Sequence, residues 1–216
     1  MIARASPWSG SWCQYRGWVT GLTAKGAATR ERIVRAAADL ILERGVGGMT
    51  LDEVRAGTAT SKSQLFHYFP GGKSELVAAI AAFQSERVLE AQRPWIERLD
   101  TFESWQAWRD GLVAYYHDLT HKYCSISALV NDVAATDPAL AVVVNEFAEQ
   151  WHGRLVAGVS RLREAGHLRP DADPERLGTA IFAALQGGLL VMQSRNSIAP
   201  LEAALDGALD MLHYHA

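Results

Sequence analysis

The sequence predicts an all-α protein, and two observations carry this prediction. Almost every segment repeats its apolar residues every three to four positions, whereas hardly any segment alternates apolar and polar residues as a half-buried strand does. Helix start signals, in which Ser, Thr or Asp precedes an apolar run, also recur along the chain. We expect about nine helices, arranged as a three-helix N-terminal unit followed by a C-terminal helical bundle.

The first two helices are predicted from their end signals. Thr29 is expected to cap a helix that ends at Gly45, where a left-handed residue would stop it. Thr50 begins the second helix, and Glu53 stands three residues later, as in a capping box. This helix is expected to end near Gly57, which makes it very short.

The third and fourth helices follow the same logic. Ser61 repeats the capping pattern with Gln64 and begins a short third helix that reaches Phe69. The fourth helix is expected over residues 73–92 and stops before Pro94, because the residue before a proline avoids helical geometry. Its length is sufficient to link two domains.

The remaining five helices form the predicted bundle. Asp100 with Glu103 starts the fifth, a shorter sixth follows Cys124, and the dipeptides Asp137-Pro138 and Asp173-Pro174 start the seventh and eighth. The ninth begins at Pro200. The expected ranges are 100–119, 124–133, 137–166, 173–193 and 200–215.

Composition restricts the class of protein. The chain of 216 residues is 49% hydrophobic and 21% charged, which is ordinary for a soluble globular protein. No uninterrupted apolar run reaches the roughly 18 residues of a membrane span, so no membrane partner is expected. Two cysteines make no disulfide framework, and this fits a reducing cytoplasm. Residues 1–22 hold no continuous apolar stretch and are expected to be a disordered leader.

Positive charge gathers at the N-terminal end. Residues 1–75 contain 10 Lys and Arg against 6 Asp and Glu, whereas residues 76–216 contain 11 against 18. The net charges are therefore +4 and −7. A polyanionic partner for the first third follows from this asymmetry, because neutralised phosphates supply most non-specific nucleic-acid affinity.

Two short capped helices joined by about four residues resemble a helix-turn-helix packed on a longer preceding helix. The segments 33–40 (IVRAAADL), 50–54 (TLDEV) and 61–76 (SKSQLFHYFPGGKSEL) look like the DNA-binding domain of the tetracycline-repressor (TetR) family. The resemblance implies a C-terminal bundle that binds a ligand and dimerises through its last two long helices. We therefore expect a DNA-binding domain at 23–75 and a ligand-binding and dimerisation domain at 76–216.

The chain departs from the family pattern in the turn before the third helix. Ala59 stands where the family usually has Gly, and Thr60 where it usually has an apolar residue. An Ala at positive φ is strained by roughly 1 kcal/mol, so either the turn is reshaped or Ala59 keeps a negative φ. Phe66 replaces a common Tyr and removes a hydroxyl that could bond phosphate, and Gly71-Gly72 lengthens the following connector by one residue.

The third helix is expected to read DNA through small polar groups on its exposed side. Leu65 and Phe69, four residues apart, are instead expected to face the first two helices. The resemblance implies that His67 and Tyr68 touch the DNA backbone or a thymine methyl group and that Lys73 pairs with a phosphate. The expected DNA-binding residues are Thr50, Ser61, Lys62, Ser63, Gln64, His67, Tyr68 and Lys73.

The second domain is rich in aromatic residues, as helical bundles that enclose a small organic ligand are. Such residues can equally be plain core. An amphiphilic or aromatic effector is expected, and no cofactor. The expected ligand-binding residues are Trp108, Tyr115, His117, Asn131 and Trp151.

The eighth and ninth helices are apolar over more than one narrow stripe, which predicts a partner inside the protomer and another outside it. Gly187-Gly188 permits close helix approach. A homodimer through these two helices is the natural arrangement, and the alternative is a monomer whose ninth helix closes the core.

The function that these features predict is a cytoplasmic, nucleoid-associated repressor that binds a palindromic operator in double-stranded DNA and is released by a small organic effector. One alternative is a redox- or metal-responsive regulator, because His117 and His121 are four residues apart and Cys124 follows one turn later. A Cys-His enzyme is the other. It needs an orienting group and an oxyanion hole that no motif supplies, so no catalytic residue and no metal ligand is assigned.

Overall fold

The computed structural model describes residues 22–117 and 138–216, and within these ranges every regular element is helical. This confirms the predicted all-α class. The expected sixth helix, the leader up to residue 21, and His121, Cys124 and Asn131 lie outside the described residues. The elements are α1 (Ala24–Gly48), α2 (Leu51–Thr58), α3 (Lys62–Tyr68), α4 (Gly72–Ala91), the 3₁₀ turn η3 (Trp95–Glu97), α5 (Phe102–His117), α7 (Pro138–Glu164), α8 (Pro174–Arg195) and α9 (Ala199–Tyr214).

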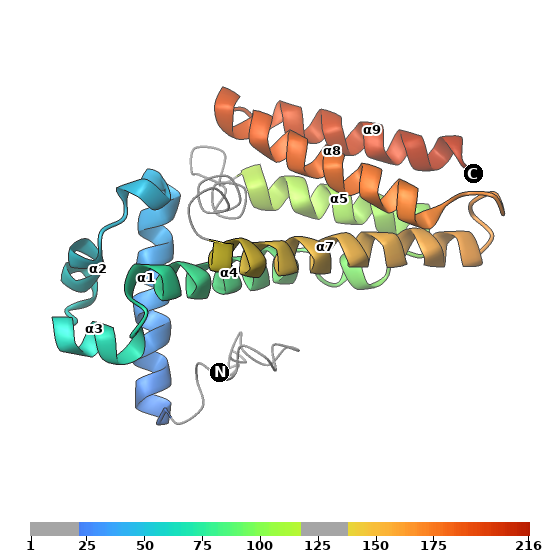
Figure 1. Ribbon diagram of the computed structural model, residues 1–216. Coiled ribbons are helices and arrows are strands. Elements are labelled where there is room, and N and C mark those ends of the chain that lie inside the picture. The colour runs from blue at the N-terminus through green and yellow to red at the C-terminus, as the bar shows by residue number, and fades with distance from the viewer. Residues whose placement is uncertain (1–21, 118–137) are drawn as a thin grey trace, which may run out of the picture.

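The helices form a small unit at one end and a bundle at the other (Figure 1). Helices α1, α2 and α3 make the small unit, and α4 leads from it into the bundle of α5, α7, α8 and α9. Within the bundle α7 packs along α4 and α8, and α8 packs along α9. This is the predicted order of a helix-turn-helix unit followed by a helical bundle.

Two hydrophobic clusters hold these parts together, and α4 belongs to both. The first cluster joins α1, α2 and α3 to the α4 residues from Leu76 to Phe83, and it includes Phe147 of α7. The second cluster fills the bundle and takes Val88 and Leu89 from the far end of α4. A displacement of α4 in the bundle therefore reaches the small unit through one continuous helix.

Two helix starts differ from the prediction. The helix α1 begins at Ala24, and the hydroxyl oxygen of Thr23 accepts the backbone N–H of Gly26 at 3.2 Å. Thr29 lies inside the helix, where its hydroxyl donates to the carbonyl of Lys25 at 2.9 Å. The expected cap at Thr29 is therefore wrong. The expected break at Gly45 is present, with φ 72°, although helical structure resumes beyond it.

The start of α5 is also displaced. Thr101 and Ser104 cap this helix reciprocally, because each side-chain oxygen accepts the other residue's backbone N–H at 3.2 Å. Asp100 was expected in that role, and the helix begins at Phe102 instead. Both Thr101 and Asp100 satisfy the same local signal, so the sequence alone did not separate them.

The start of α8 agrees with the prediction. The carboxylate of Asp173 accepts the N–H groups of Glu175 and Arg176 at 3.0 and 3.2 Å, with Pro174 in the first turn. By length and composition α8 could cross a membrane, since its most apolar window has a mean hydropathy of 1.4. In the structure it packs between α7 and α9 as a core helix of the bundle.

Candidate DNA-binding surface

The helix α2 begins with the predicted capping box. The hydroxyl oxygen of Thr50 accepts the backbone N–H of Glu53 at 3.2 Å, and the Glu53 carboxylate accepts the Thr50 N–H at 3.2 Å and its hydroxyl at 2.8 Å. These hydrogen bonds, the side-chain one first, lower the pKa of the Glu53 carboxyl, and Arg44 at 2.5 Å acts in the same direction. The start of α2 is thereby held without any partner from DNA.

The helix α3 begins with the second predicted capping box. The Ser61 hydroxyl oxygen accepts the backbone N–H of Gln64 at 3.1 Å, and the Gln64 side-chain oxygen accepts the Ser61 N–H at 3.0 Å. A bidentate contact with adenine needs both the oxygen and the nitrogen of a glutamine amide. The capping bond occupies one of the two lone pairs of the Gln64 oxygen, so a bidentate contact with adenine has to share that oxygen with the Ser61 N–H.

The turn between the two helices keeps the left-handed geometry. Ala59 has φ 48° and ψ 39°, and its N–H returns to the carbonyls of Ala56 and Arg55 at the end of α2. Both alternatives expected from the sequence, a reshaped turn and a negative φ, are wrong. The tertiary packing of the unit holds Ala59 in a conformation that costs roughly 1 kcal/mol relative to glycine.

Hydroxyl bonding explains how Thr60 occupies a buried position in this turn. The hydroxyl of buried Thr58 lies 2.8 Å from that of Thr60 and 2.7 Å from the carbonyl oxygen of Val54, so both side chains have polar partners. The carbonyl of Thr58 accepts the guanidinium of Arg32 on α1. A polar residue is tolerated here because its hydrogen bonds are satisfied locally.

One side of α3 faces solvent and the other faces the first cluster. Leu65 and Phe69 are buried against α1 and α2, as the sequence predicts. We call the opposite side the exposed α3 face. It consists of Lys62, Ser63, Gln64, Phe66 and His67.

Three of the other expected residues, Tyr68, Lys73 and Thr50, flank this face. Tyr68 is half-buried and makes an edge contact with the His67 ring, with 5.1 Å between their centroids. The Lys73 ammonium donates to the carbonyl of Met49 at 2.8 Å, so it lies directly before Thr50 at the start of α2. The structure therefore brings the expected residues of α2, α3 and α4 to one region of the small unit.

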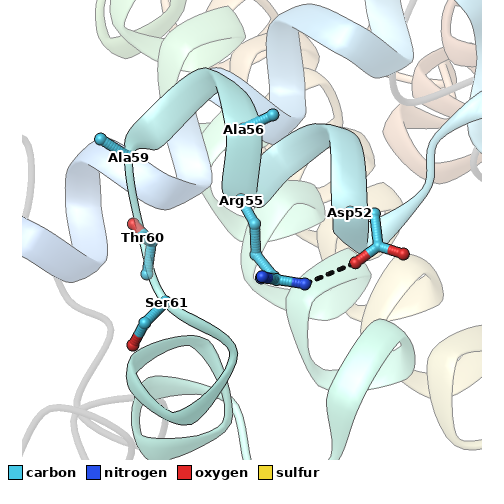
Figure 2. Close-up of a pocket in the computed structure, with 6 residues that line it drawn as sticks. All are labelled: Asp52, Arg55, Ala56, Ala59, Thr60 and Ser61. Atoms are coloured by element: carbon cyan, nitrogen blue, oxygen red, sulfur yellow. Dashed lines mark hydrogen bonds and ion pairs between the residues drawn. The ribbon is translucent and has the colours of Figure 1, made fainter.

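Sequence reasoning missed a hollow between α2 and α3 (Figure 2). It has a volume of about 440 Å³ and is lined by Asp52, Arg55, Ala56, Ala59, Thr60 and Ser61. Arg55 is held by an ion pair of 2.6 Å with Asp52 at its edge. The spacing of residues 52, 55 and 56, which places them on one face of α2, was the available signal.

Arg30 is a second residue that the sequence did not single out. Its guanidinium is buried 4.8 Å above the Phe69 ring centroid, and two of its nitrogens have no hydrogen-bond partner. Burial lowers the pKa of Arg30, and the charge of Glu75 opposes that shift. This cation anchors α1 beneath the end of α3 and does not belong to the exposed α3 face.

The expected ligand-binding residues lie in the bundle. Trp108 of α5 and Trp151 of α7 are buried and meet at the side chain of Gln92, while Tyr115 is half-buried and His117 is exposed at the end of α5. Among the described residues no group of three His, Cys, Asp or Glu side chains could hold a metal ion. The roles expected of these residues stay predictions.

Comparison with known proteins identifies the family. A family model described as bacterial regulatory proteins of the tetR family matches residues 33–80. A second model, the C-terminal domain of LmrA/YxaF-like transcriptional regulators, matches residues 101–206. The chain belongs to the TetR family. The first match covers α2, α3 and parts of α1 and α4, so the helix-turn-helix of this regulator stands where the sequence resemblance placed it.

Relatives of this TetR-family regulator match along most of its length. It is 25% identical over 185 residues to the HTH-type transcriptional repressor NemR of Escherichia coli (strain K12), a match that covers 82% of this chain and 90% of NemR. It is 21% identical over 190 residues to the HTH-type transcriptional repressor DhaR of Mycobacterium sp. (strain GP1), covering 85% and 91%.

Solved structures show the same fold. The regulatory protein TetR from Rhodobacter sphaeroides has a TM-score of 0.75 at 16% identity, with 86% of this chain and 98% of that chain covered. A TetR-family regulator from Cytophaga hutchinsonii has a TM-score of 0.76 at 18% identity, covering 90% and 98%. The family models and the named relatives make this protein a DNA-binding transcriptional regulator of the cytoplasm and not an enzyme.

Proposed function

We propose that this TetR-family regulator is a homodimeric repressor that binds a palindromic operator and leaves it when a small organic molecule enters the bundle. The observation that carries the proposal is the exposed α3 face, a short capped helix with polar side chains on its solvent side. The relatives NemR and DhaR are named repressors, which favours repression over activation.

The proposed DNA contacts divide by chemistry. Ser63 and Gln64 lie on the exposed α3 face and reach base edges, and Lys62 on the same face neutralises a phosphate. His67 and Tyr68 touch the backbone or a thymine methyl group. Thr50, Ser61 and Lys73 lie where the helices begin and approach phosphates. The Lys73 ammonium uses one of its three donors on Met49, which leaves two for a phosphate oxygen.

The proposed domains are a DNA-binding domain at 23–75 and a ligand-binding and dimerisation domain at 76–216, with a leader at 1–22. Because neutralised phosphates also give non-specific affinity, we expect the regulator to be associated with the nucleoid when it is not on its operator. The basic N-terminal third supports this division.

A dimer through α8 and α9 is supported by side chains that their packing leaves exposed. Leu190 and Val191 of α8 are 50% and 37% exposed, although both are large and apolar. Gly188 lies so close to α9 that an added Cβ would come within 2.9 Å of Ala204, whereas Gly187 faces open space. Gly187 therefore leaves room for a partner helix, and Gly188 allows the close contact between α8 and α9 within the protomer.

Release by a ligand requires coupling between the bundle and α4. We propose that the ligand contacts Trp108, Tyr115 and Trp151, with His117 and Asn131 as polar anchors. Since α4 belongs to both clusters, a ligand that favours another position of α4 moves the two α3 helices out of register. A hundredfold loss of operator affinity needs about 2.7 kcal/mol of differential ligand binding.

The experiment that tests the proposal begins with selection of bound DNA from a random pool. A palindromic sequence that binds two protomers, with half-sites about 34 to 36 Å apart, supports the proposed dimer on DNA. A pool without a preferred sequence, or a stable monomer by light scattering at micromolar concentration, contradicts it.

The sensor step needs its own measurement. Hydrophobic metabolites and drugs are screened for quenching of tryptophan fluorescence, and the hits are titrated against the complex with the selected operator. A ligand that both quenches and dissociates the complex supports release. A ligand that quenches and leaves operator affinity unchanged contradicts release by that ligand.

A further inference from the structure

An exposed aromatic ring on α3 points to a sequence preference in the operator. Phe66 is 40% exposed, and among the described residues it is the only large hydrophobic side chain exposed outside α8 and α9. Exposed apolar patches on α8 and α9 suit a partner protomer. Phe66 lies instead among the polar residues of the exposed α3 face, so it needs a different explanation.

The packing of α3 and the following connector sets the position of this ring. A Cβ added to Gly72 would lie 3.6 Å from Cε1 of Phe66, so one edge of the ring rests over the Gly71-Gly72 connector. Lys62 and Ser63 precede Phe66 by four and three residues, and side chains at these spacings are neighbours on a helix. The rest of the ring therefore lies beside Lys62 and Ser63, which the proposed function puts in contact with DNA.

We propose that Phe66 reads the C5-methyl group of a pyrimidine, thymine or 5-methylcytosine, in the major groove of each half-site. This inference rests on the proposed function, in which α3 enters the major groove. Phenylalanine has no donor or acceptor, so it cannot bind a phosphate or the polar edge of a base. The methyl group of thymine is the apolar feature that the major-groove edges present, and it fits the ring.

The size of the effect follows from the area that the contact removes from water. Burying one methyl-sized group contributes about 0.8 kcal/mol, which corresponds to about a fourfold change in affinity for each half-site. A palindromic operator presents the contact twice, so removing both methyl groups should weaken binding by about fifteenfold.

The test removes the methyl group and leaves every hydrogen bond in place. In the operator selected from the random pool, each thymine is replaced in turn, symmetrically in both half-sites, by deoxyuridine, which lacks only the methyl group. The full chain should lose about fifteenfold at the thymine position that Phe66 contacts. At that position 5-methylcytosine should bind more tightly than cytosine by a similar factor.

Variants assign this position to Phe66. With Phe66→Ala the ratio of affinities for the thymine and deoxyuridine operators should fall to about one, whereas Phe66→Leu, which keeps an apolar end, should retain part of the ratio. Lys73→Ala is the control, because it removes a proposed phosphate contact, changes absolute affinity and should leave the ratio as in the parent protein. Far-UV circular dichroism checks that each variant folds.

The outcomes separate this inference from the proposed function. If the pool yields no preferred sequence, the proposed function itself is contradicted. If an operator is bound and no thymine is sensitive to deoxyuridine, or the sensitive position stays equally sensitive in both Phe66 variants, only the role of Phe66 is contradicted.

Discussion

The indole N–H of Trp108 donates a hydrogen bond of 2.8 Å to the side-chain oxygen of Gln92, and the indole N–H of Trp151 donates to the same oxygen at 3.0 Å. The Gln92 amide nitrogen donates in turn to the carbonyl of Val88 at 2.9 Å. All three polar side chains are buried, and every one of these groups has a partner. One amide thus joins the end of α4 to α5 and α7, the helices proposed to contact the effector.

Replacing Gln92 should lower the free energy of unfolding. Gln92→Leu leaves two buried indole N–H groups without an acceptor, and an orphaned buried donor costs about 1 to 3 kcal/mol. We expect a loss of about 2 to 4 kcal/mol in the free energy of unfolding, measured by urea denaturation with circular dichroism at a single protomer concentration. Gln106→Leu, at an exposed position of α5, is the control and should cost less than about 0.5 kcal/mol.

A double-mutant cycle checks the physical reason. In a Trp108→Phe background one donor is already absent, so Gln92→Leu should cost about 1 kcal/mol less than it does in the parent protein. Equal costs in both backgrounds would show that the hydrogen bond to Trp108 contributes nothing to stability.

The strained turn predicts a stabilising substitution. Ala59→Gly relieves a left-handed residue with φ 48° and should raise the free energy of unfolding by about 0.5 to 1 kcal/mol. Ala56→Gly is the matched control, because Ala56 is also exposed but lies inside α2, three residues earlier. This variant should lower the free energy of unfolding by about 0.5 to 1 kcal/mol. Thermal denaturation of both variants measures the difference, and a destabilised Ala59→Gly would contradict the strain.

The capping box of α2 predicts a dependence of stability on pH. Because the bonds from Thr50 lower the pKa of Glu53, its carboxylate stabilises the fold above the ordinary glutamate pKa of about 4.3. That contribution is lost as the pH falls through the lower pKa of the folded state. Urea denaturation between pH 7 and pH 3 should therefore show a smaller loss of stability for Glu53→Gln than for the parent protein.

Thr50→Val supplies the control for that experiment. It removes the hydroxyl that is the largest cause of the shift, so its loss of stability with falling pH should also be smaller. If both variants lose stability with pH as steeply as the parent protein, the capping bonds are not the source of the dependence.

The proposed DNA contact of Lys62 predicts a change in salt dependence. Each neutralised phosphate contributes about 0.9 to the slope of log affinity against log salt, and a dimer presents Lys62 twice. Lys62→Ala should therefore reduce the slope by about 1.8 on the selected operator. Arg98→Ala removes an exposed cation beyond the far end of α4 and should leave the slope unchanged. Equal slopes for the two variants would place Lys62 away from DNA.

The exposed apolar side chains of α8 predict that a charge placed among them disrupts the proposed dimer. Leu190→Glu should convert the dimer to monomers at micromolar concentration, because two carboxylates would be buried against apolar surface without partners. Light scattering measures the mass. Glu202→Gln on neighbouring α9 is the control and should stay dimeric. A Leu190→Glu variant that stays dimeric would place the interface elsewhere.

Local patterns predicted the helix-turn-helix well. The two capping boxes involve residues three apart, so the sequence spacing alone determines whether the hydrogen bonds can form. The burial of Leu65 and Phe69 followed from helical periodicity in the same way. The wrong caps at Thr29 and Asp100 show the limit of such patterns, because other capping residues stood within six positions of each.

The sequence by itself determined the helical class, the order of the helices, both capping boxes and the family of this protein, since each depends on residues within a few positions of one another. Only the tertiary structure decided that Ala59 is left-handed, because the burial of Thr58 and Thr60 on either side of it outweighs the preference of a single residue. It also decided that Trp108 and Trp151 share Gln92, across separations of 16 and 59 residues. Such contacts depend on how whole helices pack, and no pattern within one helix contains that information.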